Sequence, residues 1–187
     1  MSIHRHGDDI KTRHTAAARD LTASGQRDAP VEIVDYDPTW PDRFADEHAR
    51  LQALLPDAEV HHIGSTAVRG LAAKPVIDVM ALVEDLDPPI PALVEQGGYA
   101  YPAAYNMTLD RRRWLCRPSA EHRTHHLHLI LDRPLLDRHL RFRDRLRADQ
   151  GLRDRYAALK LDLAARHPTD REAYTAAKSA FVEQNSC

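Results

Sequence analysis

The sequence predicts an α+β domain, in which a small mixed sheet carries helices on one side and leads into a C-terminal helical subdomain. Two observations support this fold class. Short apolar segments with a period of two residues occur between residues 31 and 131, and this period is typical of strands. After Pro134 the apolar residues recur every three or four positions instead, as in amphipathic helices. A length of 187 residues suits one domain with its own hydrophobic core.

The elements can be placed along the chain from local signals. The folded domain is expected at residues 30–187, after a polar tail at residues 1–29. Thr39 is the expected N-cap of the first helix, with Pro41 in its first turn. Strands are expected at residues 31–34, 59–63, 76–83, 99–101, 112–117 and 125–131. Helices are expected at residues 39–55, 88–96, 135–148, 152–167 and 170–183.

The composition indicates a globular protein. Hydrophobic residues make up 43% of the chain and charged residues 29%, and no window holds the ~18 consecutive apolar residues that a membrane span requires. The N-terminus lacks the apolar core of a signal peptide, and Cys116 and Cys187 form no disulfide framework. A net charge of -2 argues against a general nucleic-acid coat protein. We therefore expect a cytoplasmic protein that does not bind a membrane and shows no strong signal for nucleic-acid binding. The sequence does not predict its oligomeric state.

The most informative segment joins a Gly-Ser turn, formed by Gly64, Ser65 and Thr66, to a single carboxylate. Asp78 stands thirteen residues after Ser65, in the next expected strand. Gly lets the backbone approach an anion closely, and the hydroxyl groups can cap a helix whose N–H groups also bind anions. Asp78 can hold a divalent cation or accept a proton. The same spacing equally fits a helix-capping turn that is followed by a strand-end Asp.

Three familiar enzyme motifs are missing from the sequence. Residues 64–70 lack the Gly-Lys-Ser/Thr ending of a Walker loop and do not match Gly-x-Gly-x-x-Gly. The chain also lacks the Gly-x-Ser-x-Gly elbow of α/β-hydrolases. These observations argue against a P-loop kinase, a Rossmann dehydrogenase and an α/β-hydrolase.

Asp78 lacks the second carboxylate that a two-metal strand usually offers two positions later, because Met80 stands there. His126 and His128 share one face of a later strand and can fill that gap. One carboxylate with two imidazoles suits a transition metal better than magnesium. Three interpretations of the histidines stay open: metal ligands, catalytic or substrate-contacting groups without a metal, and structural partners of Asp78.

Basic residues that could contact phosphate are concentrated in the second half of the chain. Residues 111–160 carry 14 Lys/Arg against 6 Asp/Glu, and Arg suits bidentate contacts to phosphate. Helical faces with charges of alternating sign are also typical of solvated surfaces. The candidates are Lys74 in the loop before Asp78, Arg113 at the start of a strand, Arg143 and Arg147 in a stripe with His139, and Lys160 and Lys178 on the last two helices.

Several segments resemble the GrpB family. They include His62-Ile63-Gly64-Ser65-Thr66, Lys74-Pro75-Val76-Ile77-Asp78-Val79 and His125-His126-Leu127-His128-Leu129, together with residues 31–41, 139–147, 156–160 and 170–181. The resemblance covers about residues 31–184. It implies a nucleotidyltransferase-like fold, of the superfamily that includes polymerase-β-type and antibiotic nucleotidyltransferases.

The resemblance implies nucleotide chemistry. In this superfamily a Gly-Ser turn opens a helix and binds a triphosphate, which gives Gly64 and Ser65 that role and makes Asp78 the first metal carboxylate. The implied activity uses a nucleoside triphosphate and Mg²⁺ or Mn²⁺, or a transition metal, and acts on a small molecule. Asp78, His126 and His128 are then the candidate catalytic residues and metal ligands. Two alternatives are a non-catalytic module that binds a nucleotide or anionic metabolite, and another triphosphate-dependent transfer such as amide ligation.

Overall fold

A computed structural model describes residues 32–186, so the expected tail at residues 1–29 lies outside the described residues. The strands are β1 (Glu59–Ile63), β2 (Ile77–Leu82), β3 (Arg112–Pro118) and β4 (Arg123–Ile130). The helices are α2 (Trp40–Leu54), α3 (Ile90–Glu95), α4 (Ala103–Asn106), α5 (Arg133–Ala148), α6 (Gln150–Arg166) and α7 (Arg171–Gln184). A short 3-10 helix, η1, covers Ser65–Ala67. Each expected helix is present, and α4 is an addition that the sequence pattern did not predict.

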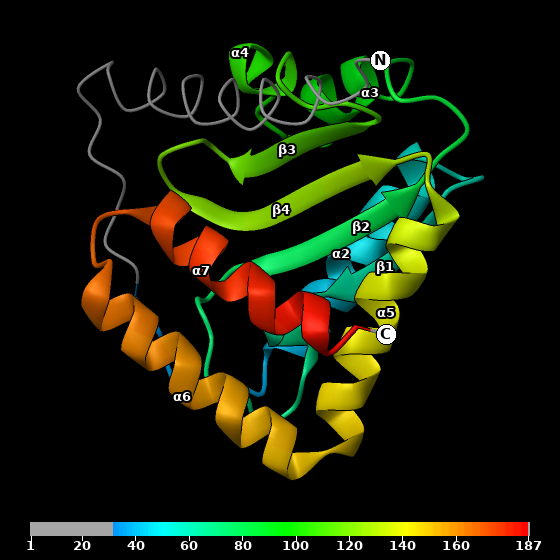
Figure 1. The fold of residues 1–187 in the computed structure, drawn as a ribbon. Coiled ribbons are helices and arrows are strands. Elements are labelled where there is room, and N and C mark those ends of the chain that lie inside the picture. The colour runs from blue at the N-terminus through cyan, green and yellow to red at the C-terminus, as the bar shows by residue number, and fades with distance from the viewer. Residues whose placement is uncertain (1–31, 187) are drawn as a thin grey trace, which may run out of the picture.

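The four strands form one mixed sheet in the order β1-β2-β4-β3 (Figure 1). β1 is antiparallel to β2, β2 is parallel to β4, and β4 is antiparallel to β3. The parallel pairing of β2 with β4 sets Asp78 opposite His126. The predicted α+β class with a small mixed sheet is therefore confirmed.

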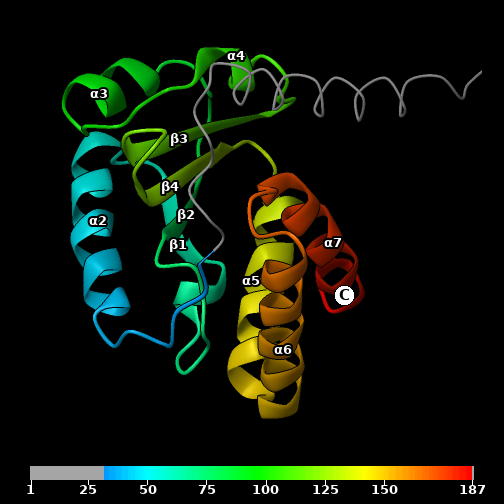
Figure 2. The same ribbon diagram turned by 90° about the vertical axis from the view of Figure 1, so that its left-hand side faces the viewer.

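Helices cover both faces of the sheet (Figure 2). On the face covered by α2 and α3, Val79, Leu115, Leu127 and Leu129 form a hydrophobic core with Trp40 and other apolar residues. On the opposite face, α5 packs Leu136 against Ile63, Met80 and Ile130. Alternate residues of each strand point to opposite faces, so the Asp78 face also carries His126 and His128.

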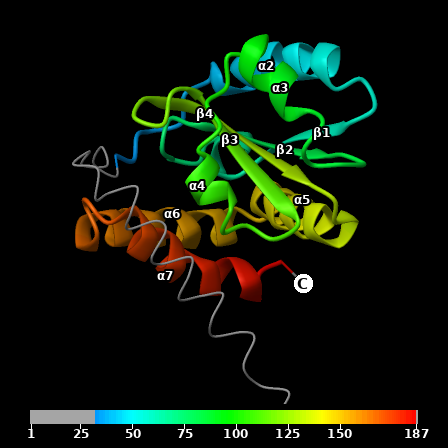
Figure 3. The ribbon, with the colours of Figure 1, turned by 90° about the horizontal axis from the view of Figure 1, so that it is seen from above.

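The C-terminal helices lie on the Asp78 side of the sheet (Figure 3). Each begins at an Asp whose carboxylate accepts a backbone hydrogen bond from the residue three positions later: Asp132 from Leu135, Asp149 from Leu152 and Asp170 from Ala173. Phe142 and Leu146 of α5 and Leu152 and Tyr156 of α6 enclose Val68 and Leu71, which follow η1 in the chain. The loop after the Gly-Ser turn is therefore held by the helical subdomain.

Two expected strands are shorter than the sequence predicted. In residues 31–34 the only pairing among the described residues is a single bridge from Val34 to Ala73, and Val31 lies outside them. Residues 99–101 supply only the bridge from Ala100 to Cys116. Gly97-Gly98 and Pro102 border this second segment, and the missing N–H of Pro102 prevents the ladder from continuing.

Thr39 is not the side-chain cap that the sequence predicted. Its hydroxyl makes no capping hydrogen bond to α2, although Pro41 does stand in the first turn. Instead the backbone N–H and the hydroxyl of Thr39 both donate to Asp37 Oδ1, each over 2.8 Å. This local hydrogen-bonded turn competes for the hydroxyl that would otherwise reach into the helix.

A buried polar network fixes the middle of α2. The Glu47 side chain is 0% exposed, and its two oxygens accept hydrogen bonds from the Tyr99 hydroxyl and the Arg117 guanidinium. Burial and the charge of Glu47 raise the pKa of Tyr99 above its usual range. The network ties α2 to β3 and to the segment before it. Within residues 32–186 no helix combines the length and apolarity needed to cross a membrane.

Candidate functional site

The Gly-Ser turn lies directly against Asp78. β1 ends at Ile63, the register partner of Asp78 on β2, and Gly64 follows with a φ of 71°. A Cβ atom at position 64 would lie 2.6 Å from Asp78 Oδ2, closer than real Cβ contacts allow. Gly64 is therefore required both by its backbone conformation and by the carboxylate beside it. The predicted convergence of the turn and the acid is observed.

The turn opens only a short helix. η1 ends at Ala67, and Val68 is already in an extended conformation with φ -114° and ψ 111°. Val68 and Leu71 are fully buried, so the chain turns into the core instead of continuing the helix. The Thr66 hydroxyl donates to the Val76 carbonyl oxygen over 3.2 Å, and the residue is 2% exposed. Thr66 thus stabilises the loop, while Gly64 is exposed and Ser65 is half-buried.

Asp78 forms a hydrogen-bonded pair with His126. The distance from His126 Nδ1 to Asp78 Oδ1 is 2.9 Å, and the two side chains are 22% and 32% exposed. Burial alone would raise the pKa of Asp78, but the hydrogen bond from His126 and nearby positive charge outweigh it and hold the pKa below its ordinary value. The carboxylate is therefore ionised at neutral pH.

His128 occupies the next position along the same face of β4, opposite Met80. Burial, with the charge of Arg112, lowers the pKa of His128 to about 3, so its ring is neutral at physiological pH. Its Nδ1 atom and the Nε2 atom of His126 are buried without a hydrogen-bond partner among the described residues. Both rings thus keep one nitrogen whose hydrogen-bonding capacity is unused.

The three expected metal ligands do not form a metal centre of their own. In the part of the chain that the structure describes, no group of three or more His, Cys, Asp or Glu side chains is placed to hold a metal ion. His126 directs Nδ1 at Asp78 and so acts as its hydrogen-bond partner. Met80, in place of a second carboxylate, is 1% exposed in the apolar cluster under α5. Asp78 Oδ2, which accepts no hydrogen bond from the described residues, does fit Mg²⁺. This ion is commonly held by one or two carboxylates together with substrate phosphates.

The C-terminal helices add polar groups beside the turn. The Tyr156 hydroxyl of α6 interacts with the Ser65 side chain, and burial raises the pKa of Tyr156 above its usual range. The Lys178 ammonium of α7 lies near enough to help hold the pKa of Asp78 low. Two lysines lie near the Tyr174 ring, with Lys74 Nζ 4.2 Å and Lys178 Nζ 5.5 Å from its centroid. Lys74 and Lys178, two of the predicted phosphate contacts, are therefore brought together on this side.

Two other predicted phosphate contacts, Arg113 and Lys160, bond to other parts of the fold. Arg113 shares the sheet face of Leu129, opposite to that of Asp78, and donates to Asp87 over 2.9 Å. Lys160 is 2% exposed and donates to the Ala72 carbonyl oxygen, and burial lowers its pKa to about 7. Arg113 is therefore on the far face of the sheet from Asp78. Lys160 lies closer to the turn, with its Nζ 5.0 Å from the ring centroid of Tyr156, but it is buried and bonded to the backbone.

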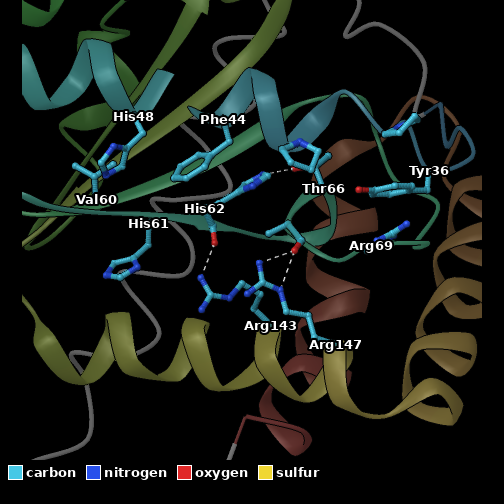
Figure 4. Close-up of a pocket in the computed structure, with 13 residues that line it drawn as sticks. Tyr36, Phe44, His48, Val60, His61, His62, Thr66, Arg69, Arg143 and Arg147 are labelled. Atoms are coloured by element: carbon cyan, nitrogen blue, oxygen red, sulfur yellow. Dashed lines mark hydrogen bonds between the residues drawn. The ribbon is translucent and has the colours of Figure 1, made fainter. Parts of the chain in front are cut away.

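Arg143 and Arg147 reach the backbone next to the turn. Arg143 donates to the His62 carbonyl oxygen over 3.0 Å, and Arg147 donates to that of Ala67 over 3.0 and 2.8 Å. The predicted polar stripe therefore docks α5 onto the chain on either side of Gly64. Both residues also line a pocket of about 740 Å³ at the outer edge of β1, between α2 and α5 (Figure 4).

Sequence reasoning did not predict this pocket. Its ring side chains include Tyr36, Phe44 and His48, of which Phe44 stacks on His62 with the ring centroids 4.5 Å apart. Phe44 and His48 have the helical spacing of core residues, and this spacing gave no sign of a cavity. The presence of two adjacent rings, His61 and His62, just before Gly64 was the available signal.

Replacing Gly64 by Ala is expected to destabilise the protein by roughly 1–3 kcal/mol, because the new methyl group meets Asp78 Oδ2 and the backbone conformation is strained. Gly70→Ala is the matched control. Gly70 has a φ of 79°, but a Cβ there meets nothing within 4 Å. Thermal unfolding of both variants measures the difference, and equal losses of stability would show that the contact with Asp78 is unimportant.

Comparison with known proteins identifies the family of this chain. A UPF0157 protein of Pseudomonas aeruginosa is 37% identical over 166 residues, which are 85% of this chain and 67% of that protein. The UPF0157 protein YqkA of Bacillus subtilis is 36% identical over 82% of this chain, which spans only 45% of YqkA. The crystal structure of the conserved protein GrpB from Enterococcus faecalis superimposes with a TM-score of 0.72 at 34% identity, covering 83% of this chain and 94% of that one. The family model described as GrpB protein matches residues 30–186, and the chain therefore belongs to the GrpB family.

Proposed function

We propose that this domain is an enzyme of the nucleotidyltransferase superfamily, which binds a nucleoside triphosphate at the Gly-Ser turn and acts on a small molecule. The observation that carries the proposal is the contact between Gly64 and Asp78, with 2.6 Å between a Cβ built at position 64 and Asp78 Oδ2. An exposed glycine that allows close backbone approach thus adjoins an ionised carboxylate. A triphosphate bound there would have its phosphorus atoms beside the acid.

Positive charge near the turn supports phosphate binding. Lys74 and Lys178 reach this side from the loop before β2 and from α7, and both lie against the ring of Tyr174. Lysine binds phosphate as a mobile point charge, which suits a triphosphate whose negative charge is spread over many oxygens. The Ser65 hydroxyl adds a further polar group at the turn.

Asp78 provides the carboxylate oxygen for a Mg²⁺ ion that would enter with the triphosphate. When bound, such an ion would supply charge neutralisation for the phosphate oxygens. His126 keeps the carboxylate in place through the hydrogen bond to Oδ1, leaving Oδ2 on the side of the turn. His126 thus serves as a positioning residue in this proposal.

The proposed reaction is an in-line displacement at the α-phosphorus. A nucleophilic oxygen of the acceptor forms the new bond to phosphorus, and the bond to the bridging oxygen breaks to release pyrophosphate. The acceptor loses its proton to water, or to the Asp78 carboxylate if this group acts as the base instead of holding the ion. The protein contributes position and charge stabilisation.

Thermal unfolding with ATP, GTP, CTP or UTP and MgCl₂ tests the proposal. At a hundredfold excess over Kd, binding adds about 2.7 kcal/mol of stability, which raises Tm by roughly 5–11 °C for a chain of this length. AMP with MgCl₂ is the control, because it lacks the phosphates that the lysines would bind. If none of the four triphosphates raises Tm above the AMP value, the proposal fails.

The position of Met80 favours a second candidate function, a non-catalytic module that binds a nucleotide or an anionic metabolite. The residue that would supply the second carboxylate is instead buried in the apolar cluster with Ile63, Ile130 and Leu136. A site with one acid retains its attraction for a triphosphate with bound Mg²⁺ while losing much of the two-metal chemistry. Pyrophosphate release from the triphosphates that bind distinguishes the two candidates.

A further inference from the structure

We propose that the pocket at the outer edge of β1 is a second binding site, which takes a small anionic molecule with a planar aromatic body. The pocket has a volume of about 740 Å³, within the size range of small-molecule sites. It lies between α2 and α5, whereas Asp78 lies on β2 within the sheet. Thr66 of the Gly-Ser turn lines the pocket, but Gly64, Ser65 and Asp78 do not, so this inference goes beyond the function proposed above.

The charge of the lining favours an anion. Three arginines, Arg69, Arg143 and Arg147, line the pocket, and no Asp or Glu of the described residues does so. Asp144, outside the pocket, pairs with Arg143 and Arg147 and offsets one of their two charges. Arg69 is exposed, and within the described part of the chain no hydrogen bond or ion pair engages its guanidinium group. A net positive charge is therefore left for a ligand.

Ring side chains form much of the remaining wall. The Phe44 and His62 rings are stacked with their centroids 4.5 Å apart at 11°, and the His48 and Phe44 ring centroids are 5.7 Å apart at an interplanar angle of 60°. Stacked and edge-on rings offer flat apolar surface, on which a planar ligand gains contact at little conformational cost. Figure 4 shows Tyr36 and Arg69 together at one end of the pocket, with the stacked pair at its centre.

His62 adds a buried ring behind Phe44 without adding charge. Burial, with the nearby charges of Arg147 and Arg143, lowers the pKa of His62 to about 4, so the ring is neutral at pH 7. Its Nε2 atom lies 3.0 Å from the Thr66 hydroxyl oxygen, which holds the ring against the wall. The anionic group of a ligand would therefore be held by arginine, and its body by the rings.

Isothermal titration calorimetry with benzoate and phenyl phosphate tests the site. Benzamide is the neutral control of similar shape, and inorganic phosphate is the anion without a ring. We expect benzoate and phenyl phosphate to bind at least tenfold more tightly than either control, with an affinity that falls as salt is added. If benzamide binds as well as benzoate, or if neither aromatic anion binds in a saturable way, the proposal is overturned.

Two variants locate the binding. Arg69→Ala is expected to weaken phenyl phosphate binding roughly tenfold, as for the loss of one charged hydrogen bond. Arg138→Ala is the matched control, because Arg138 is exposed on α5 and does not line the pocket. Equal effects of the two substitutions would overturn the proposal. Both side chains are exposed, so the variants are expected to fold.

A further comparison separates this site from the Gly-Ser turn. Asp78→Asn, which alters the proposed triphosphate site, is expected to change phenyl phosphate affinity by less than about threefold, because Asp78 lies outside the lining. A saturating amount of inorganic triphosphate with MgCl₂, which offers phosphates to the turn but has no aromatic body for the pocket, is likewise expected to leave phenyl phosphate bound. Loss of phenyl phosphate binding in either experiment would assign it to the turn and would reject a second site.

Discussion

Asp78→Asn is expected to lower the rate of pyrophosphate release from a bound nucleoside triphosphate by at least about 100-fold, while leaving triphosphate affinity similar or higher. The carboxylate is ionised in the folded protein, since His126 and nearby positive charge hold its pKa below the ordinary value. Asparagine keeps the shape and the contact with Gly64 but removes the charge. The variant therefore tests the charge of the site with little change in its packing.

Asp57→Asn is the control for this prediction, because it removes one exposed carboxylate from the loop between α2 and β1. Pyrophosphate release and the triphosphate-induced shift in Tm should both be measured for each variant. Wild-type release that survives in Asp78→Asn would place the chemistry elsewhere. Triphosphate binding without any release, in the wild type and in the variant, would favour the binding module.

Glu47→Gln is expected to reduce the free energy of unfolding by roughly 3–5 kcal/mol, which lowers Tm by about 6–20 °C. The carboxylate is completely buried and accepts hydrogen bonds from Tyr99 and Arg117. An amide at this position leaves the guanidinium of Arg117 without its counter-charge and places an NH₂ group against a donor. The loss exceeds that of a surface ion pair because water cannot replace the missing partner.

Asp46→Asn provides the comparison, since Asp46 precedes Glu47 on α2 and is exposed. A change within about 0.5 kcal/mol is expected there. Urea unfolding followed by circular dichroism measures both variants. A similar small change in Glu47→Gln would mean that the buried network contributes little to stability.

Most helices and strands could be predicted from the sequence because hydrophobic periodicity and capping residues are local patterns. The alternation in β1 and β4 and the helical spacing after Pro134 gave elements close to the observed ones. The convergence of the Gly-Ser turn and Asp78 was also accessible, because β1 and β2 follow each other in the chain and pair directly in the sheet. The pairing of β2 with β4 was not, because parallel strands are brought together by long-range packing that leaves no fixed spacing.

The basic residues show where sequence reasoning reached its limit. A stripe such as Arg143 and Arg147 is suited to any oxygen acceptor, and here the acceptors are the backbone carbonyls of His62 and Ala67. Lys160 likewise reaches the Ala72 carbonyl oxygen. A sequence pattern of basic residues does not tell whether they bind phosphate oxygens or backbone carbonyl oxygens. Only the tertiary structure distinguishes the two. The pocket between α2 and α5 was missed for the same reason, because its walls come from separate elements.

The three tethers from the helical subdomain have a consequence for biosynthesis. Arg143, Arg147 and Lys160 donate hydrogen bonds to backbone carbonyl oxygens that lie 80 to 88 positions earlier in the chain. When β4 has just left the ribosome, all four strands have been synthesised but α5 and α6 have not. The Gly64 segment therefore still lacks its contacts with Arg143, Arg147 and Lys160. The Gly64 segment is therefore anchored last, only after the final third of the chain has folded.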